Sequence, residues 1–178
     1  MDIQYLEDAL SVLGQTHTIS ASIQDGEIVE WSGDIPQPTI EELENMLPQV
    51  LQYRLQVKKA EKLAEIANRR WVEETKGISL PNGAAVKTDR ESQALLTGAS
   101  VKALQDPTYT CKWKGSSGWV VLDAPTILMI AEFVRQHVQQ CFDREYELSV
   151  QIETIMNDPF LTDQQKIDAI DAVTWESE

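Results

Sequence analysis

The chain has 178 residues, of which 42% are hydrophobic and 25% are charged, so it can form a packed core and is not globally disordered. It carries 15 Lys and Arg against 29 Asp and Glu, a net charge of −14, which argues against nucleic-acid binding because such proteins present a basic face. No apolar run approaches the ~20 residues that a membrane-spanning helix needs. The composition therefore predicts a soluble, acidic protein that binds neither nucleic acid nor membrane.

Residues 1–48 contain ten acids and no Lys or Arg, which sets them apart as an acidic N-terminal arm. A short amphipathic helix over 3–13 should be followed by a hairpin, with strands over 16–23 and 28–31 joined at Asp25-Gly26. Thr39 and Glu42 have the spacing of a capping box, which predicts a short helix before Pro48. Solvated surface is the simplest interpretation of the acids, and a docking module is the alternative.

Residues 49–76 are expected to form the first long helix, which Gly77 ends. Its apolar residues at strict 3-4 spacing define what we call the first-helix seam: Val50, Tyr53, Val57, Ala60, Ala64, Ala67 and Trp71. A second apolar flank consists of Leu51, Leu55, Leu63 and Ile66. We expect the seam to be buried, with Trp71 in the core, either against the second long helix or against copies of the chain.

Two hairpins are expected between the long helices. The first pairs residues 78–80 with 84–86, and the second pairs 109–113 with 119–122 around a glycine-rich loop, where Trp113 and Trp119 should face each other. The helix between the hairpins should begin at Thr88-Asp89-Arg90, capped by a hydroxyl or a carboxylate, and Thr88 and Glu91 have capping-box spacing. A binding role for this cluster is the alternative.

The second long helix should begin at Asp123 and run to about Met156. Its seam contains one polar residue, Glu145, among Ile127, Ala131, Val134, Val138, Cys141, Leu148, Ile152 and Ile155. A final short helix should start at Thr162 or Asp163. The predicted fold class is α+β, with two long amphipathic helices packed with two β-hairpins and an acidic N-terminal hairpin–helix arm. The predicted domains are the arm (1–48), a core domain (49–156) and a C-terminal helix (157–178).

No pattern of nucleophile, base and orienting group is present, because the only histidines, His17 and His137, stand alone on a predicted strand and a predicted helix. Cys111 and Cys141 belong to no paired metal motif, and we interpret them as reduced cysteines, with a disulfide as the alternative. We therefore expect no enzyme activity, no cofactor, no metal and no small-molecule substrate.

The candidate partner-binding residues are large side chains on the seam or near the ends of predicted order: Trp31, Val50, Tyr53, Val57, Trp71 and Trp175. The seam favours a homo-oligomer. The arm combines acids with apolar residues, so we expect it to be the main docking element, with Trp31 as an anchor. The alternative is that the arm folds onto the basic helix of its own chain through Arg54, Lys58, Lys59 and Lys62.

From Lys62 to Ile155 the sequence resembles a domain of unknown function found in tailed-bacteriophage tail-fibre and fibre-assembly proteins. The resemblance rests on an ordered set of residues: Arg69, Arg70, Glu74, Gly77-Ile78, the run from Thr88 to Gln93, the run from Leu96 to Ala99, Trp113-Lys114, the run from Gly118 to Leu122, His137-Val138, Cys141-Phe142 and Glu145. The stretch from Ile28 to Leu43 is similar to the lead-in that small phage tail proteins place before this domain.

The resemblance implies a virion-related, non-enzymatic protein that is made in the host cytoplasm and located in the tail, with other fibre or baseplate proteins as partners. We therefore expect a tail structural component that acts as an adaptor. A transient fibre-assembly chaperone is the first alternative. An acidic inhibitor that mimics nucleic acid is the second, although the acids are divided between the two ends of the chain around a basic middle.

Overall fold

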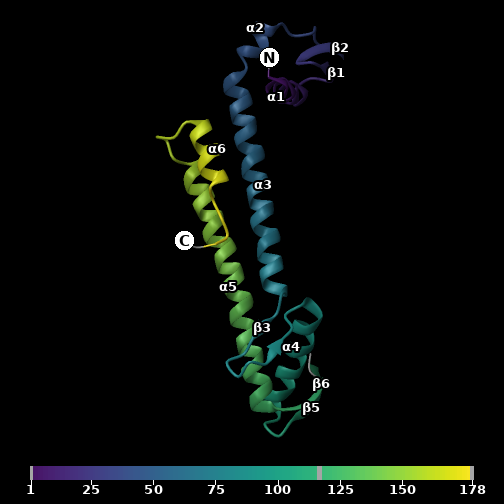
Figure 1. Cartoon of the computed structure of the whole chain (residues 1–178), viewed down its shortest axis with the longest axis vertical. Coiled ribbons are helices and arrows are strands. Elements are labelled where there is room, and N and C mark those ends of the chain that lie inside the picture. Colours follow the sequence, from purple (N-terminus) through teal and green to yellow (C-terminus); the bar gives the residue numbers. More distant parts are fainter. Residues whose placement is uncertain (1, 116–117, 177–178) are drawn as a thin grey trace. The chain divides into compact units, whose positions relative to one another are not determined.

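The computed structural model describes residues 2–115 and 118–176, which form helices and three small antiparallel hairpins (Figure 1). The contacts group these residues into two compact units. Unit 1 comprises residues 1–63 and 152–173, and unit 2 comprises residues 64–151 and 174–178. The α+β fold class is confirmed. The domain boundaries predicted at 48/49 and 156/157 stay predictions. Among the described helices, none is both long and apolar enough to cross a membrane.

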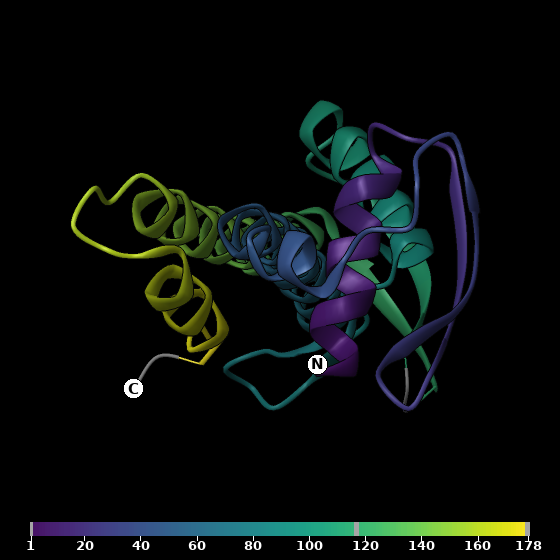
Figure 2. The ribbon, with the colours of Figure 1, turned by 90° about the horizontal axis from the view of Figure 1, so that it is seen from above.

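Unit 1 begins with α1 (Ile3–Gly14), which Asp2 caps by accepting a 3.0 Å hydrogen bond from the Tyr5 amide. The hairpin of β1 (Ile19–Gln24) and β2 (Glu27–Gly33) follows, and it runs beside α1 (Figure 2). Its turn has positive φ at Asp25 and Gly26, as the sequence predicted. The first strand starts at Ile19 and not at 16, because the His17 amide still bonds the Leu13 carbonyl and extends the helical turn.

The remaining elements of unit 1 are α2 (Ile40–Glu44), the first part of α3 (Leu47–Thr75), the last turn of α5 (Ala124–Met156) and α6 (Asp163–Asp171). The capping box of Thr39 and Glu42 is present. Thr162 caps α6 with a second capping box. The core of this unit joins the buried side chains of Leu6, Ala9, Leu43 and Val50. Part of the apolar set of the arm, Leu6, Ala9 and Leu43 among it, thus packs within unit 1 against the start of α3.

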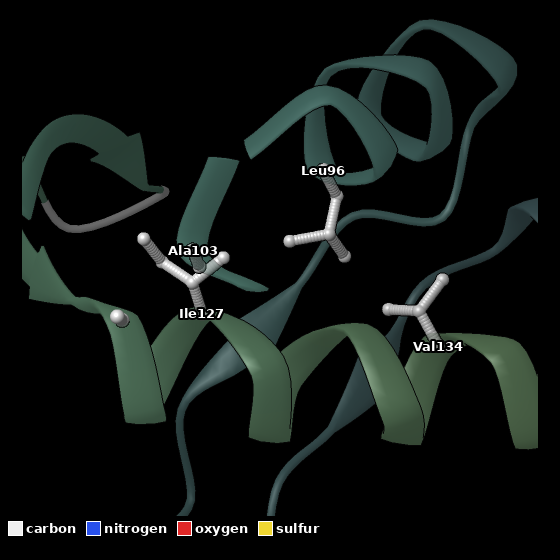
Figure 3. Close-up of a cluster of buried hydrophobic side chains, with 5 residues drawn as sticks. Leu96, Ala103, Ile127 and Val134 are labelled. Carbon is white, nitrogen blue, oxygen red and sulfur yellow. The ribbon is translucent and has the colours of Figure 1, made fainter. Parts of the chain in front are cut away.

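Unit 2 contains β3 (Ile78–Ser79), β4 (Ala85–Val86), α4 (Arg90–Gln105), β5 (Thr110–Gly115) and β6 (Gly118–Asp123), with the adjoining parts of α3 and α5. Asp123 caps α5 by accepting a 3.0 Å bond from the Thr126 amide. Figure 3 shows the core, in which Leu96 and Ala103 of α4 meet Ile127 and Val134 of α5. The seam predicted for the second long helix is confirmed, since most of its members are buried.

The predicted burial of the first-helix seam is wrong. Only Val50 is fully buried, whereas Val57 is 37% exposed, Trp71 is 44% exposed, and Ala60 and Ala64 are exposed. The buried side of α3 instead carries Leu55, Lys62, Ile66 and Glu74. Small alanines offer little apolar area, so the larger side chains and a buried ion pair decide which face turns inward.

The predicted pairing of Trp113 with Trp119 is also wrong. The register pairs Trp113 with Val120 and Trp119 with Lys114. Because facing residues of an antiparallel pair share one side of the sheet and neighbours alternate, the two tryptophans lie on opposite sides. Trp113 packs against the core, and Trp119 is 70% exposed.

Candidate functional site: a buried carboxylate network and the surfaces around it

The polar network of unit 2 is built around the carboxylate of Glu74, which is fully buried near the end of α3. Arg70 donates to it at 2.5 Å from one turn earlier. Arg90 approaches it at 3.0 Å and 3.2 Å from the start of α4. Gln93 donates to it at 3.1 Å. Both oxygens of this carboxylate are occupied, as a buried charge requires.

Thr88 joins the same network through the backbone. Its hydroxyl, which is fully buried, donates to the Glu74 carbonyl at 2.5 Å and accepts from the Gly77 amide at 2.9 Å. Gln93 donates to the Thr88 carbonyl at 2.7 Å. The predicted capping box of Thr88 and Glu91 is therefore wrong. The predicted helix start is confirmed, because the carboxylate of Asp89 is the N-cap of α4 and accepts from the Ser92 amide at 2.9 Å.

Helix α5 is connected to the network by three contacts. Arg70 donates to Glu145 at 2.7 Å, and its guanidinium lies 4.5 Å from the Phe142 ring centre. His137 Nε2 lies 3.0 Å from the Glu73 carbonyl, which can only accept, so this nitrogen is the donor. These contacts make α3 and α5 antiparallel neighbours in unit 2, and they account for the polar position that Glu145 occupies in the second-helix seam.

The pKa shifts in unit 2 favour the charged form of Arg70 beside its two glutamates and the neutral form of Cys141. Burial alone would lower the pKa of Arg70, but the hydrogen bonds and charges of Glu145 and Glu74 outweigh this effect and raise it above its ordinary value. Burial raises the pKa of the Cys141 thiol, and the neighbouring Glu73 and Glu74 add to that rise. This cysteine is thereby kept as a thiol, and both Cys141 and Cys111 are free.

The network is formed by residues on which the sequence resemblance rested, namely Arg70, Glu74, Thr88, Arg90, Gln93, His137 and Glu145. Their joint effect is to fix the end of α3, the start of α4 and the middle of α5 to one another. Spacing alone did not reveal this arrangement, because the partners of Glu74 lie up to 19 residues away on another element.

The structure distributes the predicted partner-binding residues over both units. In unit 1, Val50 is part of the core, Tyr53 is half-buried, and Trp31 donates to the Ile35 carbonyl at 3.0 Å. In unit 2, Trp71 is exposed with the Arg90 guanidinium 5.1 Å from its ring centre, and Trp175 is half-buried, its carbonyl accepting from Arg144 at 3.0 Å. The predicted placement of Trp71 in the core is thus wrong, because its ring remains at the surface beside a cation.

Exposed aromatic side chains lie beside the network, and of these the sequence had singled out Trp71 alone. On α5, Phe142 is 41% exposed and Tyr146 is 71% exposed, one helical turn apart on the same face. On α3, Ala64 and Trp71 are exposed within unit 2. We call the three aromatic residues of this set, Trp71, Phe142 and Tyr146, the aromatic face. Exposed aromatic side chains held on fixed helices are typical of protein-binding surfaces.

Two family models match separate parts of the chain. Residues 57–174 match the family model described as "Domain of unknown function (DUF4376)", and this match spans more than half of the chain. The chain belongs to that family. Residues 6–54 match the model described as "XkdW protein", a phage-associated family, and this match associates the chain with bacteriophages. Searches among curated proteins and among solved structures gave no significant match.

Proposed function

We propose that this protein is a structural component of a phage tail, a fibre- or baseplate-associated adaptor that works through protein–protein contacts and catalyses no reaction. The observation that carries the proposal is the aromatic face. Trp71, Phe142 and Tyr146 are exposed on two helices that the Glu74 network holds together. A solvent-exposed aromatic set is costly for an isolated protein and useful for one that is covered in an assembly.

The chemistry of the network supports the same function. Arg70 and Arg90 each lie over an aromatic ring of this face, at 4.5 Å from the Phe142 ring centre and 5.1 Å from the Trp71 ring centre. Their guanidinium groups also bind Glu74, so the same ion pairs that stabilise unit 2 restrict the motion of the exposed rings. Preformed side chains lose little conformational entropy on binding, which suits an adaptor.

The proposal is tested with the phage or prophage that encodes the chain. Particles carrying Trp71→Ala and Tyr146→Ala, which remove exposed rings of the face, should incorporate less of the protein than wild-type particles do. The matched control is Phe160→Ala, because Phe160 is 91% exposed and belongs to unit 1. Incorporation is measured by mass spectrometry of purified particles. Equal incorporation of all variants would contradict the role of the face, and complete absence of the wild-type protein from particles would instead favour the transient chaperone.

A further inference from the structure

Two hairpins of the chain have open strand edges of opposite charge. The β1–β2 hairpin of unit 1 and the β5–β6 hairpin of unit 2 are both two-stranded sheets. Each strand therefore pairs with a single neighbouring strand within the described residues, and its other edge has no strand partner there. Open edges of this kind are the usual sites of strand addition.

The β5 edge opens onto a groove of 630 Å³ between this strand and α4. The strand side of the groove is lined by consecutive residues of β5, among them Lys112, Trp113 and Lys114. The helix side includes Leu95, which is 59% exposed, and Gly98, where an added Cβ would meet nothing within 4 Å. The helix side also carries Asp89, Glu91 and Ser92 near the start of α4. The groove thus has a basic strand wall, a helix wall that is acidic at its start and apolar further along, and room beside the strand.

The charges of the two strands are complementary. Strand β5 carries Lys112 and Lys114 and no acid, and both lysines are exposed in a chain of net charge −14. Strand β2 carries Glu27 and Glu30, both exposed, and no base. Apolar side chains accompany the charges on both hairpins.

Large apolar side chains are exposed on both hairpins. Val29 of β2 is 54% exposed, and Trp119 and Val121 of β6 are each 70% exposed. Lys114 lies 5.9 Å from the Trp119 ring centre, so charge and aromatic surface are presented together. An acidic strand with apolar side chains fits this hairpin better than a nucleic acid, whose phosphates would be repelled by the acidic chain as a whole.

We propose that β2 of one copy of the protein adds to the β5 edge of a second copy. Main-chain hydrogen bonds would supply affinity. The register shift of the β1–β2 hairpin makes Val29 an extra residue and brings Glu27 and Glu30 to the same side of the sheet, so both could face Lys112 and Lys114 and select the partner. Because the two surfaces differ, the contact is heterologous and can be repeated from copy to copy, which generates a ring or a filament. The proposal concerns contacts between copies and does not depend on where in the particle the protein resides, so it can fail while the tail function stands.

Charge exchange tests the proposal with the full chain. The β5 variant carries Lys112→Glu and Lys114→Glu, which make this strand acidic. The β2 variant carries Glu27→Lys and Glu30→Lys, which make that strand basic. Self-association is measured by sedimentation velocity at low and high salt. The wild type should associate at low salt and less so at high salt. Each variant should associate about tenfold more weakly or not at all, because two ion pairs become two repulsions.

Rescue distinguishes a specific contact from a general effect of charge. An equimolar mixture of the two variants should associate again, and so should the variant with all four exchanges. The controls, Lys76→Glu with Lys102→Glu and Glu7→Lys with Glu41→Lys, change net charge equally at exposed positions of the same units and should leave association unchanged. Gly98→Leu should also weaken association, because it puts a large side chain at a groove position where an added Cβ meets nothing within 4 Å.

The proposal is overturned if the wild type stays monomeric at low salt at every concentration. It is equally overturned if the two strand variants associate as the wild type does. It is also overturned if the equimolar mixture of the two variants does not associate although both variants retain the wild-type circular dichroism spectrum.

Discussion

Glu74→Ala should be among the most destabilising substitutions in unit 2, because it removes the carboxylate on which Arg70, Arg90 and Gln93 converge. Breaking a buried ion pair by deleting one partner costs ~3–5 kcal/mol when the remaining charge is left buried. Arg90 is 52% exposed at its side chain and returns to water, whereas Arg70 is 15% exposed but keeps Glu145. The expected loss is therefore at the lower end, about 3 kcal/mol.

The loss is measured by urea unfolding followed by circular dichroism at neutral pH, where the wild-type free energy of unfolding should lie within the usual ~5–15 kcal/mol. Glu74→Gln preserves the shape and one oxygen acceptor and should lose less. Glu91→Ala is the control, because this acid is exposed on α4, and it should change stability by no more than about 0.5 kcal/mol. If Glu74→Ala were as stable as Glu91→Ala, the network would not hold unit 2 together.

Three further predictions concern burial, helix propensity and pH. Leu148→Ala should lower the free energy of unfolding by ~2–5 kcal/mol because the side chain is 2% exposed. Ala64→Asp should leave the melting temperature of the monomer almost unchanged because Ala64 is exposed. Thermal melts of both variants at low protein concentration check this, and a large drop in the melting temperature of Ala64→Asp would show that the first-helix seam is buried after all. Gly98→Ala should stabilise by ~0.5–1 kcal/mol, since the new Cβ meets no neighbour and alanine favours helix; a lower midpoint in urea would refute it. Hydrogen bonds from Thr126 lower the pKa of Asp123, so the stability from this cap is complete above the unfolded pKa near ~4 and is lost as the pH falls below it; melts at successive pH values should show a shallower acid decline in Asp123→Asn, and parallel curves would refute the cap.

Local signals in the sequence predicted much of the fold. Asp25-Gly26 gave the first hairpin, because glycine accepts positive φ, and Thr39 with Glu42 gave the start of α2. The second-helix seam was predictable because large apolar residues recur on it, and most of them are buried. In each case the residues that decide the structure lie within a few positions of one another.

The sequence-based predictions were wrong where the structure depends on contacts between residues that are far apart in the sequence. The first-helix seam follows heptad spacing, yet its alanines bury little area, and Arg70 and Glu74 turn the other face of α3 toward α5 and α4. Thr88 has the spacing of a capping residue, but its hydroxyl is taken by the Glu74 carbonyl. Helical periodicity cannot reveal such contacts, since they join segments that only the tertiary structure brings together.

The tryptophan pair illustrates a different limit. Trp113 and Trp119 were expected to face each other, but β5 and β6 pair Gly115 with Gly118, so the register places Trp113 opposite Val120. A shift of one residue moves a side chain to the other side of a sheet. The exposure of Trp119 could not be foreseen without the register, and it is this exposure that makes the β5–β6 hairpin a candidate contact between copies.

The proposal that this phage-associated protein is a resident part of the tail is best tested by quantitative mass spectrometry of purified particles and of isolated tails. We expect the protein to be present in both at a fixed ratio to other tail proteins and to remain after high-salt washing of the particles. Its presence in the infected or induced cell together with its absence from purified particles would contradict the claim.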